Sequence, residues 1–421
     1  MGYYPCLTSA WQTGTRGTNS RSLTRLADGY SLAIKRIHAI FRRMDSTAFA
    51  RNLYLSHRIE PVTQARLDEW DASMREAQRL PATRWQRRRD AFLRAASTSA
   101  STRIEGNQLS LWETDQLQAG MRIEGRERDQ REVRNYSTAL GLAAELGGRE
   151  SFEWHEMVLQ QLNAAVMRGL ENDTRGAYRT GPVTVGAGFY AAPNAASVPA
   201  LMATLVDWLE ATELHPLVRV SLLHLNLAAI HPWFDGNGRT MRIVCQLDLG
   251  RVVRAPHLVN IEPVLAADQD GYFRRIRDAV GMSWDPENHV ASAWVDWYVG
   301  LHLDALREGL ALDEATRQDM TVILAALERR GEDADWGPVI LTAAYGEFTT
   351  RLIQGMYGNS SSATRVMVGR LVDAGWLLST GETRGRTYHP SDLVASLGLA
   401  SPGLARRLAR AEPSERPNQE S

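Results

Sequence analysis

The chain has 421 residues, of which 44% are hydrophobic and 23% charged, a composition typical of a folded globular protein. Lys and Arg total 48 and Asp and Glu 49, so the formal net charge of −1 does not indicate a nucleic-acid binder that is basic throughout. Two cysteines, Cys6 and Cys245, are too few for a disulfide framework and favour a reducing, cytoplasmic compartment. The most apolar stretch, 217–230, is too short to span a bilayer, so we expect no membrane contact.

Composition and periodicity predict five regions along the chain. Residues 1–43 are rich in Thr, Ser, Gly and Arg and predict a flexible arm. Residues 44–145 carry apolar side chains at helical spacing and predict several amphipathic helices. Residues 146–310 remain mostly helical and predict the main compact domain, and residues 311–399 predict a smaller one. Residues 400–421 end in EPSERPNQES and predict a disordered tail.

One part of the main domain departs from the helical pattern. Alternating residues run into a pair of glycines, which predicts a short β-hairpin over 183–190. The first arm and turn of this hairpin are Val183, Thr184, Val185 and Gly186. Farther along, 217–230 is apolar on almost all sides, which predicts a buried central helix.

The C-terminal region opens with a helical pattern, continues with a helical pair joined by a turn, and ends in a short β segment. That order is typical of a winged helix-turn-helix. The predicted fold class is therefore mostly α: a helical bundle with a short hairpin, followed by a C-terminal winged helix-turn-helix domain. Acidic residues outnumber basic ones over 311–399, which is unfavourable for contacts with DNA phosphates. A protein-docking or dimerising role is favoured, with DNA binding as the alternative.

The most informative stretch is HPWFDGNGRTMR, residues 231–242. Pro232 should end the apolar helix and leave His231 at its terminus, where a histidine can act as a base near neutral pH. Gly236 and Gly238 allow successive backbone N–H groups to point into one concavity, which suits an anion. These residues together favour a site for a negatively charged substrate.

Charged side chains complete this pattern. A second helix begins near Gly238, so its positive end faces the same place. Arg239 and Arg242 lie three residues apart and project from one side of its first turn, as two cations for a polyphosphate. Asp235 adds one hard oxygen ligand, which suits a Mg²⁺ ion that takes its other ligands from phosphate and water. A base, a metal ligand and a phosphate cradle so close together imply phosphoryl or nucleotidyl transfer.

This string resembles the motif of the Fic family, HPFx(D/E)GNGRxxR, and departs from it at one defined position, where Trp233 replaces phenylalanine. Residues 176–179 and 183–186 resemble the family's approach to its hairpin, and the resemblance covers roughly 60–300. It implies the Fic helical bundle, for which a winged-helix domain is a common companion. It also implies a protein adenylyltransferase, which transfers AMP from ATP, with Mg²⁺, to a Ser, Thr or Tyr hydroxyl of a target protein.

The resemblance implies a role for each residue of the motif. His231 would take the proton from the target hydroxyl, and Asp235 would hold Mg²⁺ between the α- and β-phosphates. The hairpin would align an extended segment of the target by strand addition. His224 also fits the family's helix, and we interpret it as a structural core histidine. The residues expected to contact the nucleotide are Gly236, Asn237, Gly238, Arg239, Thr240, Arg242 and, near the adenine ring, Tyr272.

A second motif lies upstream, in the segment STRIEGN. Ser101 and Glu105 are one helical turn apart and resemble the family's inhibitory motif, (S/T)xxxE(G/N). A carboxylate at this place would pair with Arg242 and deny that arginine to the γ-phosphate, so the α-phosphate would not be in line for attack. The order of the two motifs implies the subtype with an N-terminal inhibitory helix.

Alternatives stay open at this level. The motif selects a phosphate-transfer geometry and not a base, so transfer of another nucleotide, transfer of phosphocholine and removal of AMP remain within the same fold. A DNA-binding regulator that acts through the C-terminal domain is the alternative from a different class. The resemblance further implies self-modification and a homodimer.

Overall fold

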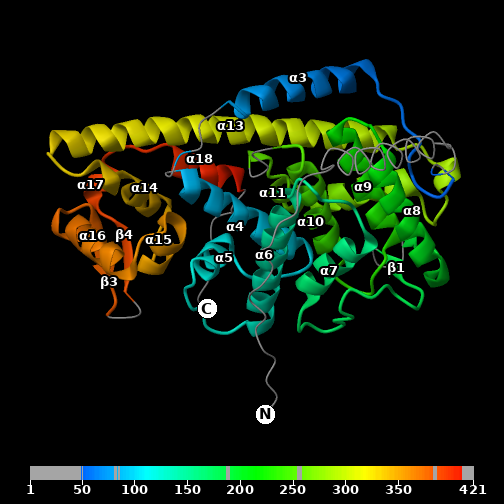
Figure 1. Ribbon diagram of the computed structural model, residues 1–421, viewed down its shortest axis with the longest axis horizontal. Helices are drawn as coiled ribbons and strands as arrows, with labels where there is room; N and C mark the ends of the chain where they lie inside the picture. The colour runs from blue at the N-terminus through cyan, green and yellow to red at the C-terminus, as the bar shows by residue number, and fades with distance from the viewer. Residues whose placement is uncertain are drawn as a thin grey trace, which may run out of the picture. The chain divides into compact units, whose positions relative to one another are not determined.

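The computed structural model describes residues 49, 51–79, 83, 86–185, 190–253, 258–382 and 386–409. Most of these residues are helical (Figure 1), so the predicted mostly α fold is confirmed. The predicted arm 1–43, the last part of the predicted tail and Gly186 lie outside the described residues. The helices that the structure describes include none with a stretch long and apolar enough to cross a bilayer.

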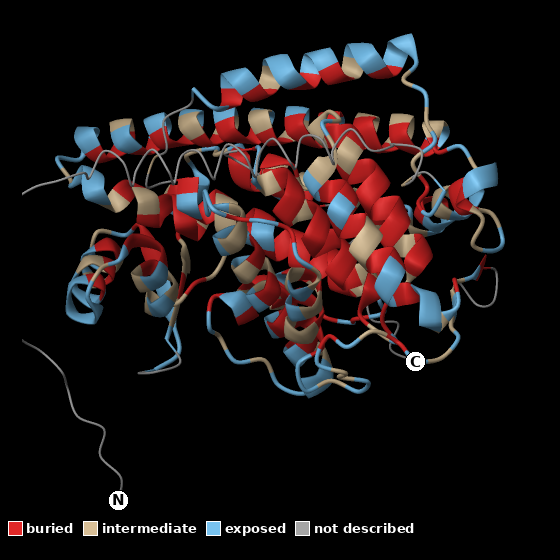
Figure 2. Ribbon diagram, turned by 45° about the vertical axis from the view of Figure 1, so that its right-hand side comes forward, coloured by how far each residue is buried: buried red, intermediate tan, exposed pale blue. Residues whose placement is uncertain are grey.

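Two consecutive helices form the centre of the fold: α9 (Pro216–Ile230) and α10 (Asn237–Gly250). Twelve of the 15 residues of α9 are buried, which confirms the predicted central helix (Figure 2). Proline starts α9 at a position where its missing N–H costs nothing. The two helices pack against each other, so the loop that joins them is held at both ends.

The helices around this pair share its hydrophobic core. α6 and α7 pack on α10, and α8 and α12 pack on α9, while α11 packs on α4. The bounds are α4 Gln86–Ile104, α6 Glu127–Gly147, α7 Glu156–Met167, α8 Val198–Ala211, α11 Glu262–Ala267 and α12 Gln269–Val280. Two 3-10 turns, η1 Ala195–Ser197 and η3 Pro286–Asn288, lie in the connections. The burial of these apolar faces is the main stabilising contribution.

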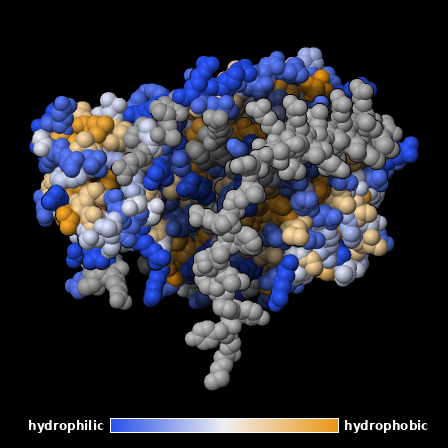
Figure 3. All heavy atoms as spheres, in the orientation of Figure 1, coloured by the Kyte–Doolittle hydropathy of each residue, from blue (hydrophilic) through white to orange (hydrophobic). Residues whose placement is uncertain are grey.

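The longest helix, α13 (Ser292–Arg329), has 38 residues, and α3 (Pro61–Ala77) lies along it (Figure 1). α3 buries Leu67, Trp70 and Met74 at the three-to-four spacing of one helix face. Its outer face is hydrophilic, as Figure 3 shows along the top of the view. Because a long apolar stripe of α13 is covered in this way, α3 belongs to the body of the fold.

α13 passes through 310/311, the predicted boundary between two domains, without a break. Two hydrophobic cores meet along it, since Leu306 belongs to the first core and Leu312 to the second. α4 also joins the cores, because Phe92 lies in the second and Ile104 in the first. The division of the chain into domains therefore stays a prediction.

α5 (Leu111–Gln118) follows α4 and has a complete capping box. The Ser110 hydroxyl accepts a hydrogen bond from the Glu113 amide, and the Glu113 carboxylate accepts one from the Ser110 amide. This reciprocal pair fixes where the chain turns after α4.

The C-terminal part contains α14 (Gly337–Tyr345), α15 (Thr350–Tyr357) and α16 (Ser361–Asp373), followed by an antiparallel hairpin of β3 (Leu377–Thr380) and β4 (Thr387–Pro390). A bridge between Phe348 and Tyr388 adds a third short segment to this sheet. A 3-10 turn, η4 (Ala334–Trp336), precedes these elements and α17 (Asp392–Ala395) follows them. The order of helices and hairpin is the expected one, and the assignment as a winged helix-turn-helix stays a prediction.

The predicted disordered tail is wrong at its start, because Ser401–Leu408 forms α18. Asp319 of α13 accepts hydrogen bonds from the amides of Ala400 and Ser401, at 2.9 and 2.7 Å, and so anchors the first turn. Ala405 is buried in the second core. Pro, Gly and Arg give this stretch a polar average composition, which hides the few apolar positions that pack.

Candidate active site

The loop between α9 and α10 is held from outside by Arg179, a buried guanidinium surrounded by backbone carbonyls. Arg179 Nε donates to the carbonyl of His231 at 2.8 Å, and Nη1 donates to that of Gly181 at 3.0 Å. Its own amide N–H donates to the carbonyl of Pro232 at 2.9 Å. Because these acceptors are all main-chain atoms, Arg179 fixes the path of the loop and the place of its histidine.

Asn237 ties the loop to itself. Its Oδ1 accepts from the amide of Trp233 at 3.0 Å, and its Nδ2 donates to the carbonyl of the same residue at 2.8 Å. Trp233 is buried, and its Nε1 donates to the carbonyl of Gly176 at 3.0 Å. The Asn237 side chain is thus engaged within the loop, so its contact with a phosphate, which stays a prediction, would use the backbone N–H.

Gly236 precedes α10 with a φ of 76°, in the region that favours glycine. A Cβ at this position would lie 2.7 Å from Met167 Sδ, so the close approach of α7 also requires glycine. The first N–H groups of an α-helix have no acceptor within the helix, which makes a helix N-terminus a site for anions. The start of α10 is such a terminus, and it lies at the end of the glycine turn.

His231 caps α9 in the left-handed region, with φ 49° and ψ 63°. This conformation is uncommon for a residue other than glycine and turns the chain sharply towards the loop. Burial lowers the pKa of His231 to about 4, opposed by the nearby carboxylates of Glu105 and Asp235. The imidazole is therefore neutral at pH 7 and can accept a proton.

Arg242 meets the C-terminal end of α4. Its Nη2 donates to Glu105 Oε1 at 2.9 Å and to the Ser101 carbonyl at 2.9 Å, and its Nε donates to Ser101 Oγ at 2.7 Å. Burial opposes the charge of Arg242, but the Glu105 carboxylate, together with the nearby Tyr272 and Tyr136, more than offsets burial and raises the pKa of this guanidinium. The structure therefore contains the pair that the upstream motif led us to expect, and its inhibitory role stays a prediction.

The Glu105 carboxylate also rests on the first turn of α10. A Cβ built on Gly238 would lie 2.1 Å from Glu105 Oε1, so no larger residue fits there without displacing the acid. A negative group is favoured at this end of a helix. Glu105 thus occupies the place that suits an anionic ligand.

Arg239 has two carboxylate partners, of which the sequence pointed to neither. Its Nη1 pairs with Glu132 of α6, and its Nη2 donates to Asp235 Oδ1 at 3.0 Å. The other oxygen of Glu132 accepts from Asn107 Nδ2 at 2.7 Å. Asn107 follows the Glu105 turn, so one carboxylate connects the end of α4 with the first arginine of the motif.

Thr240 and Tyr272 lie inside the fold. Asn163 Nδ2 donates to Thr240 Oγ1 at 3.2 Å, and Thr240 is buried. Tyr272 is 1% exposed, and its hydroxyl lies 2.7 Å from His224 Nε2. Their predicted contacts with a nucleotide remain predictions, and Tyr272 could reach one only if neighbouring side chains moved.

His224 is a structural core residue, as we interpreted it. It is fully buried and bonds two tyrosine hydroxyls, that of Tyr272 and, through Nδ1 at 2.8 Å, that of Tyr298. Burial holds the pKa of His224 well below its ordinary value. A neutral imidazole between two hydroxyls explains why a polar side chain is tolerated in α9.

The predicted hairpin forms, with β1 (Thr184–Val185) antiparallel to β2 (Tyr190–Ala191). Thr184 pairs with Ala191 and Val185 with Tyr190. The far side of β2 bonds the 282–284 segment, through the Ala191 amide to the Met282 carbonyl at 2.9 Å. Of the two strands, β1 is therefore the one at the edge.

Glu105, Gly238, Arg242 and His231 thus come together from α4, α9 and α10, whereas Thr240 and Tyr272 point into the core. The parts played by Glu132 and Asn107 are those that no motif indicated: Glu132 is a buried acid of α6, and Asn107 is buried just after the turn that follows α4. A histidine and two arginines beside a helix N-terminus are the kind of arrangement that suits an anionic ligand such as a phosphate.

Comparison with known proteins finds one family that matches part of this chain. Residues 151–249 match the Fic/DOC family. A Fic family protein from Desulfovibrio desulfuricans G20 is similar over 80% of this chain and 98% of its own, with a TM-score of 0.52 and 26% identity. A fragment of Fic-1 from Caenorhabditis elegans has a TM-score of 0.50 and 23% identity over 61% of this chain and 74% of its own, which supports the fold alone.

The curated relatives are similar over a shorter stretch. The protein adenylyltransferase fic-1 of Caenorhabditis briggsae is 34% identical over 170 residues, which cover 38% of this chain and 32% of the relative. The protein adenylyltransferase Fic of Drosophila erecta is 28% identical over 229 residues, covering 51% and 44%. The chain thus spans less than half of the length of these relatives.

Proposed function

We propose that the chain is a protein adenylyltransferase that transfers AMP from ATP to a Ser, Thr or Tyr hydroxyl of a target protein. The observation that carries the proposal is the placement of His231 beside the glycine turn, with Arg242 and the start of α10 on the same side. The similarity to protein adenylyltransferases supports it. The few cysteines favour action in the cytoplasm.

The reaction needs a base, and His231 supplies it. The neutral imidazole accepts the proton of the target hydroxyl while the hydroxyl oxygen forms a bond to the α-phosphorus. The bond from that phosphorus to the bridging oxygen of the β-phosphate breaks, and pyrophosphate leaves. The negative phosphates of bound ATP would raise the pKa of His231 from about 4 and strengthen the base.

The triphosphate would occupy the N-terminal turn of α10. The amides of Gly236, Asn237 and Gly238 suit the α-phosphate, and Arg239 and Arg242 suit the β- and γ-phosphates. Both guanidiniums already face carboxylates in this structure, so ATP would exchange one set of anionic partners for another.

Asp235 is the candidate ligand for Mg²⁺. Its side chain is 35% exposed, and its bonds to the Gly236 amide and to Arg239 both use Oδ1. Oδ2 therefore suits a cation, and a single carboxylate is sufficient for an ion held mainly by phosphates and water. When bound, the ion would neutralise charge on the α- and β-phosphates.

Glu105 acts in this proposal as a brake. While its carboxylate holds Arg242 and covers Gly238, the γ-phosphate lacks its cation, and ATP would bind with its α-phosphate out of line for attack. Release of Glu105 would open both positions at once.

The hairpin would bind and align the target protein. β1 is the edge strand, so an extended segment of a target could pair with the backbone of Thr184 and Val185. This mode fixes a hydroxyl in place while most side chains of the target are ignored. Self-modification and a homodimer belong to the same proposal.

The test uses the full chain with Glu105 replaced by glycine, offered each of four labelled nucleoside triphosphates with Mg²⁺. We expect a mass increase of one AMP on a hydroxyl residue with ATP, and none with Glu105→Gly/His231→Ala, although the double variant still binds ATP. Preference for another nucleotide, or loss of AMP from an already modified target, would replace adenylylation by a related reaction of the same fold.

A further inference from the structure

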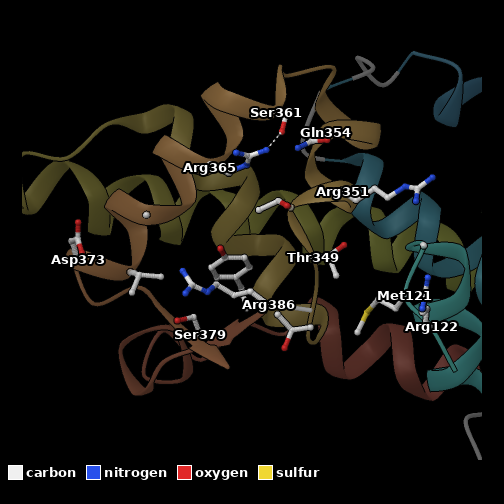
Figure 4. Close-up of a pocket in the computed structure, with 16 residues that line it drawn as sticks. Met121, Arg122, Thr349, Arg351, Gln354, Ser361, Arg365, Asp373, Ser379 and Arg386 are labelled. Carbon is white, nitrogen blue, oxygen red and sulfur yellow. Dashed lines mark hydrogen bonds between the residues drawn. The ribbon is translucent and has the colours of Figure 1, made fainter. Parts of the chain in front are cut away.

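A wide groove lies between the C-terminal helices and the turn after α5, away from the loop that carries His231. Its volume is about 1160 Å³. One wall is formed by α15, α16 and β4, and the other by the turn that includes Met121 and Arg122, as the close-up in Figure 4 shows. A Cβ on Gly120 would lie 3.1 Å from Arg351 Cδ, so the two walls meet at one end.

Four arginines from four separate segments line this groove: Arg122, Arg351, Arg365 and Arg386. All four are exposed, and none forms an ion pair with a carboxylate of the residues that the structure describes. Asp373 is the one acidic residue among the lining residues. Most buried arginines of this chain face acids, so unpaired guanidiniums gathered along one groove indicate an anionic ligand.

The uncharged residues of the lining favour phosphates over a protein surface as the ligand of this groove. Residues with hydroxyl groups lie beside the arginines in the lining: Thr350, Ser361, Ser379 and Thr387. Such hydroxyls and arginines are the usual partners of nucleic-acid phosphates. A protein interface is centred on large apolar or aromatic anchors, and this lining has no large exposed apolar side chain among its described residues.

The same lining favours a duplex over a single strand. Proteins that bind single strands combine a positive groove with exposed aromatic rings on which the bases stack. The aromatic residue in this lining, Tyr388, is 8% exposed and packs against Phe348. A duplex keeps its bases stacked and offers its phosphate backbone, which needs only the arginines and hydroxyls.

The excess of acidic residues over 311–399 does not contradict this inference, because most of those acids lie elsewhere. Seven of them fall between 313 and 335, on α13 and the turn that follows it, and none of the seven lines the groove. The net charge of the region therefore hides a local positive surface.

We propose that this groove binds the phosphate backbone of double-stranded DNA through Arg122, Arg351, Arg365 and Arg386. The site is separate from the candidate active site and does not depend on the proposed transfer of AMP. It would hold the chain on DNA in a manner that depends on charge and not on base sequence.

The test measures binding of the full chain to a fluorescein-labelled duplex of mixed sequence by anisotropy, at several salt concentrations. The variant Arg365→Glu/Arg386→Glu removes two of the four cations. Arg370→Glu/Arg406→Glu is the matched control, because it makes the same change in net charge at exposed positions outside the lining. Arg365→Gln/Arg386→Gln serves as a milder pair, and thermal unfolding checks that every variant is folded.

We expect the wild type to bind with a logarithmic salt slope of about 4, and the groove variant to bind at least about tenfold more weakly with a slope lower by about 2. The control should bind within about threefold of the wild type. No binding at low salt, an equal loss in the control, or stronger binding to a single strand, heparin or a phosphopeptide would each overturn the proposal.

Discussion

Glu105 Oε1 lies 2.9 Å from Arg242 Nη2 and directly above the backbone of Gly238. One carboxylate therefore neutralises a buried cation and covers a helix N-terminus at the same time. The consequences of its removal can be separated into an effect on transfer and an effect on stability.

We expect Glu105→Gly to increase self-labelling from ATP by about tenfold or more, because a hydrogen bond to a charged group contributes about 1.5–3 kcal/mol and would no longer hold Arg242. The measurement is the initial rate of label incorporation into the full chain. His231→Ala in the same background is the control and should abolish labelling while ATP still binds. Equal rates for wild type and Glu105→Gly would reject the brake.

Glu105→Gly should also lower the stability of the free protein, and bound ATP should restore part of it. Without Glu105, Arg242 keeps its bonds to Ser101 but loses its charge partner, so we expect the free energy of unfolding to fall by about 1–3 kcal/mol. ATP with Mg²⁺ should then raise the melting temperature of Glu105→Gly more than that of the wild type. Identical shifts in both proteins would show that Glu105 and the nucleotide do not compete.

Glu132→Ala should destabilise the fold strongly, by about 3 kcal/mol, because it removes the buried charge partner of Arg239, which keeps only the more exposed Asp235, and an acceptor of the Asn107 amide. Glu145→Ala is the matched control, since it removes an exposed pair with Arg149 on the same helix and should cost about 0.5 kcal/mol or less. Chemical denaturation of both variants makes the comparison. Similar costs would mean that Glu132 is not a structural partner of Arg239.

The pH dependence of transfer should report the depressed pKa of His231. Because the free protein holds this group neutral down to about pH 4, kcat/KM of Glu105→Gly should not fall near pH 6.5, the midpoint of an ordinary histidine. The decline should begin lower, towards pH 4, since removal of the Glu105 charge lowers this pKa further. A midpoint at 6.5 would indicate an exposed histidine or another base.

Folding stability, like the rate of transfer, should fall as the pH falls. A histidine whose pKa is lower in the folded than in the unfolded chain binds its proton mainly after unfolding. His231 and the buried His302, both with a pKa of about 4, should therefore leave stability intact above pH 6.5 and reduce it as the pH falls towards 4. Urea unfolding of the wild type and His302→Gln at pH 7 and pH 5 measures it. A loss of the same size in both proteins would contradict a role for His302.

Much of the site could be predicted because its chemistry is local in sequence. The residues from His231 to Arg242 sit on one loop and one helical turn, where spacing determines which side chains face the same way. Glu105 could be placed only through a motif, because its contact with Arg242 joins helices far apart in the chain. Glu132 had no such motif, since an acidic residue on an amphipathic helix is ordinarily exposed.

The fold was predictable where apolar residues dominate, as in α9. It was less predictable in polar segments, where only a few apolar residues are buried. α18 was missed because few apolar residues carry it, and its anchor is Asp319 on a distant helix. Composition did not show that α13 continues across 310/311. The residues on the two sides pack in different hydrophobic cores, although the helical pattern is the same on both.

The helix that carries Glu105 has its other end clamped elsewhere. Arg88 of α4 pairs with Asp115 at 2.6 Å, and the Phe92 ring meets that of Tyr345 from α14. A chain that ended with α13 would lose Tyr345 and the other contacts that α14 and α18 make with α4. The C-terminal helices are therefore part of the packing around the helix that leads to Glu105, and their removal would expose one end of it.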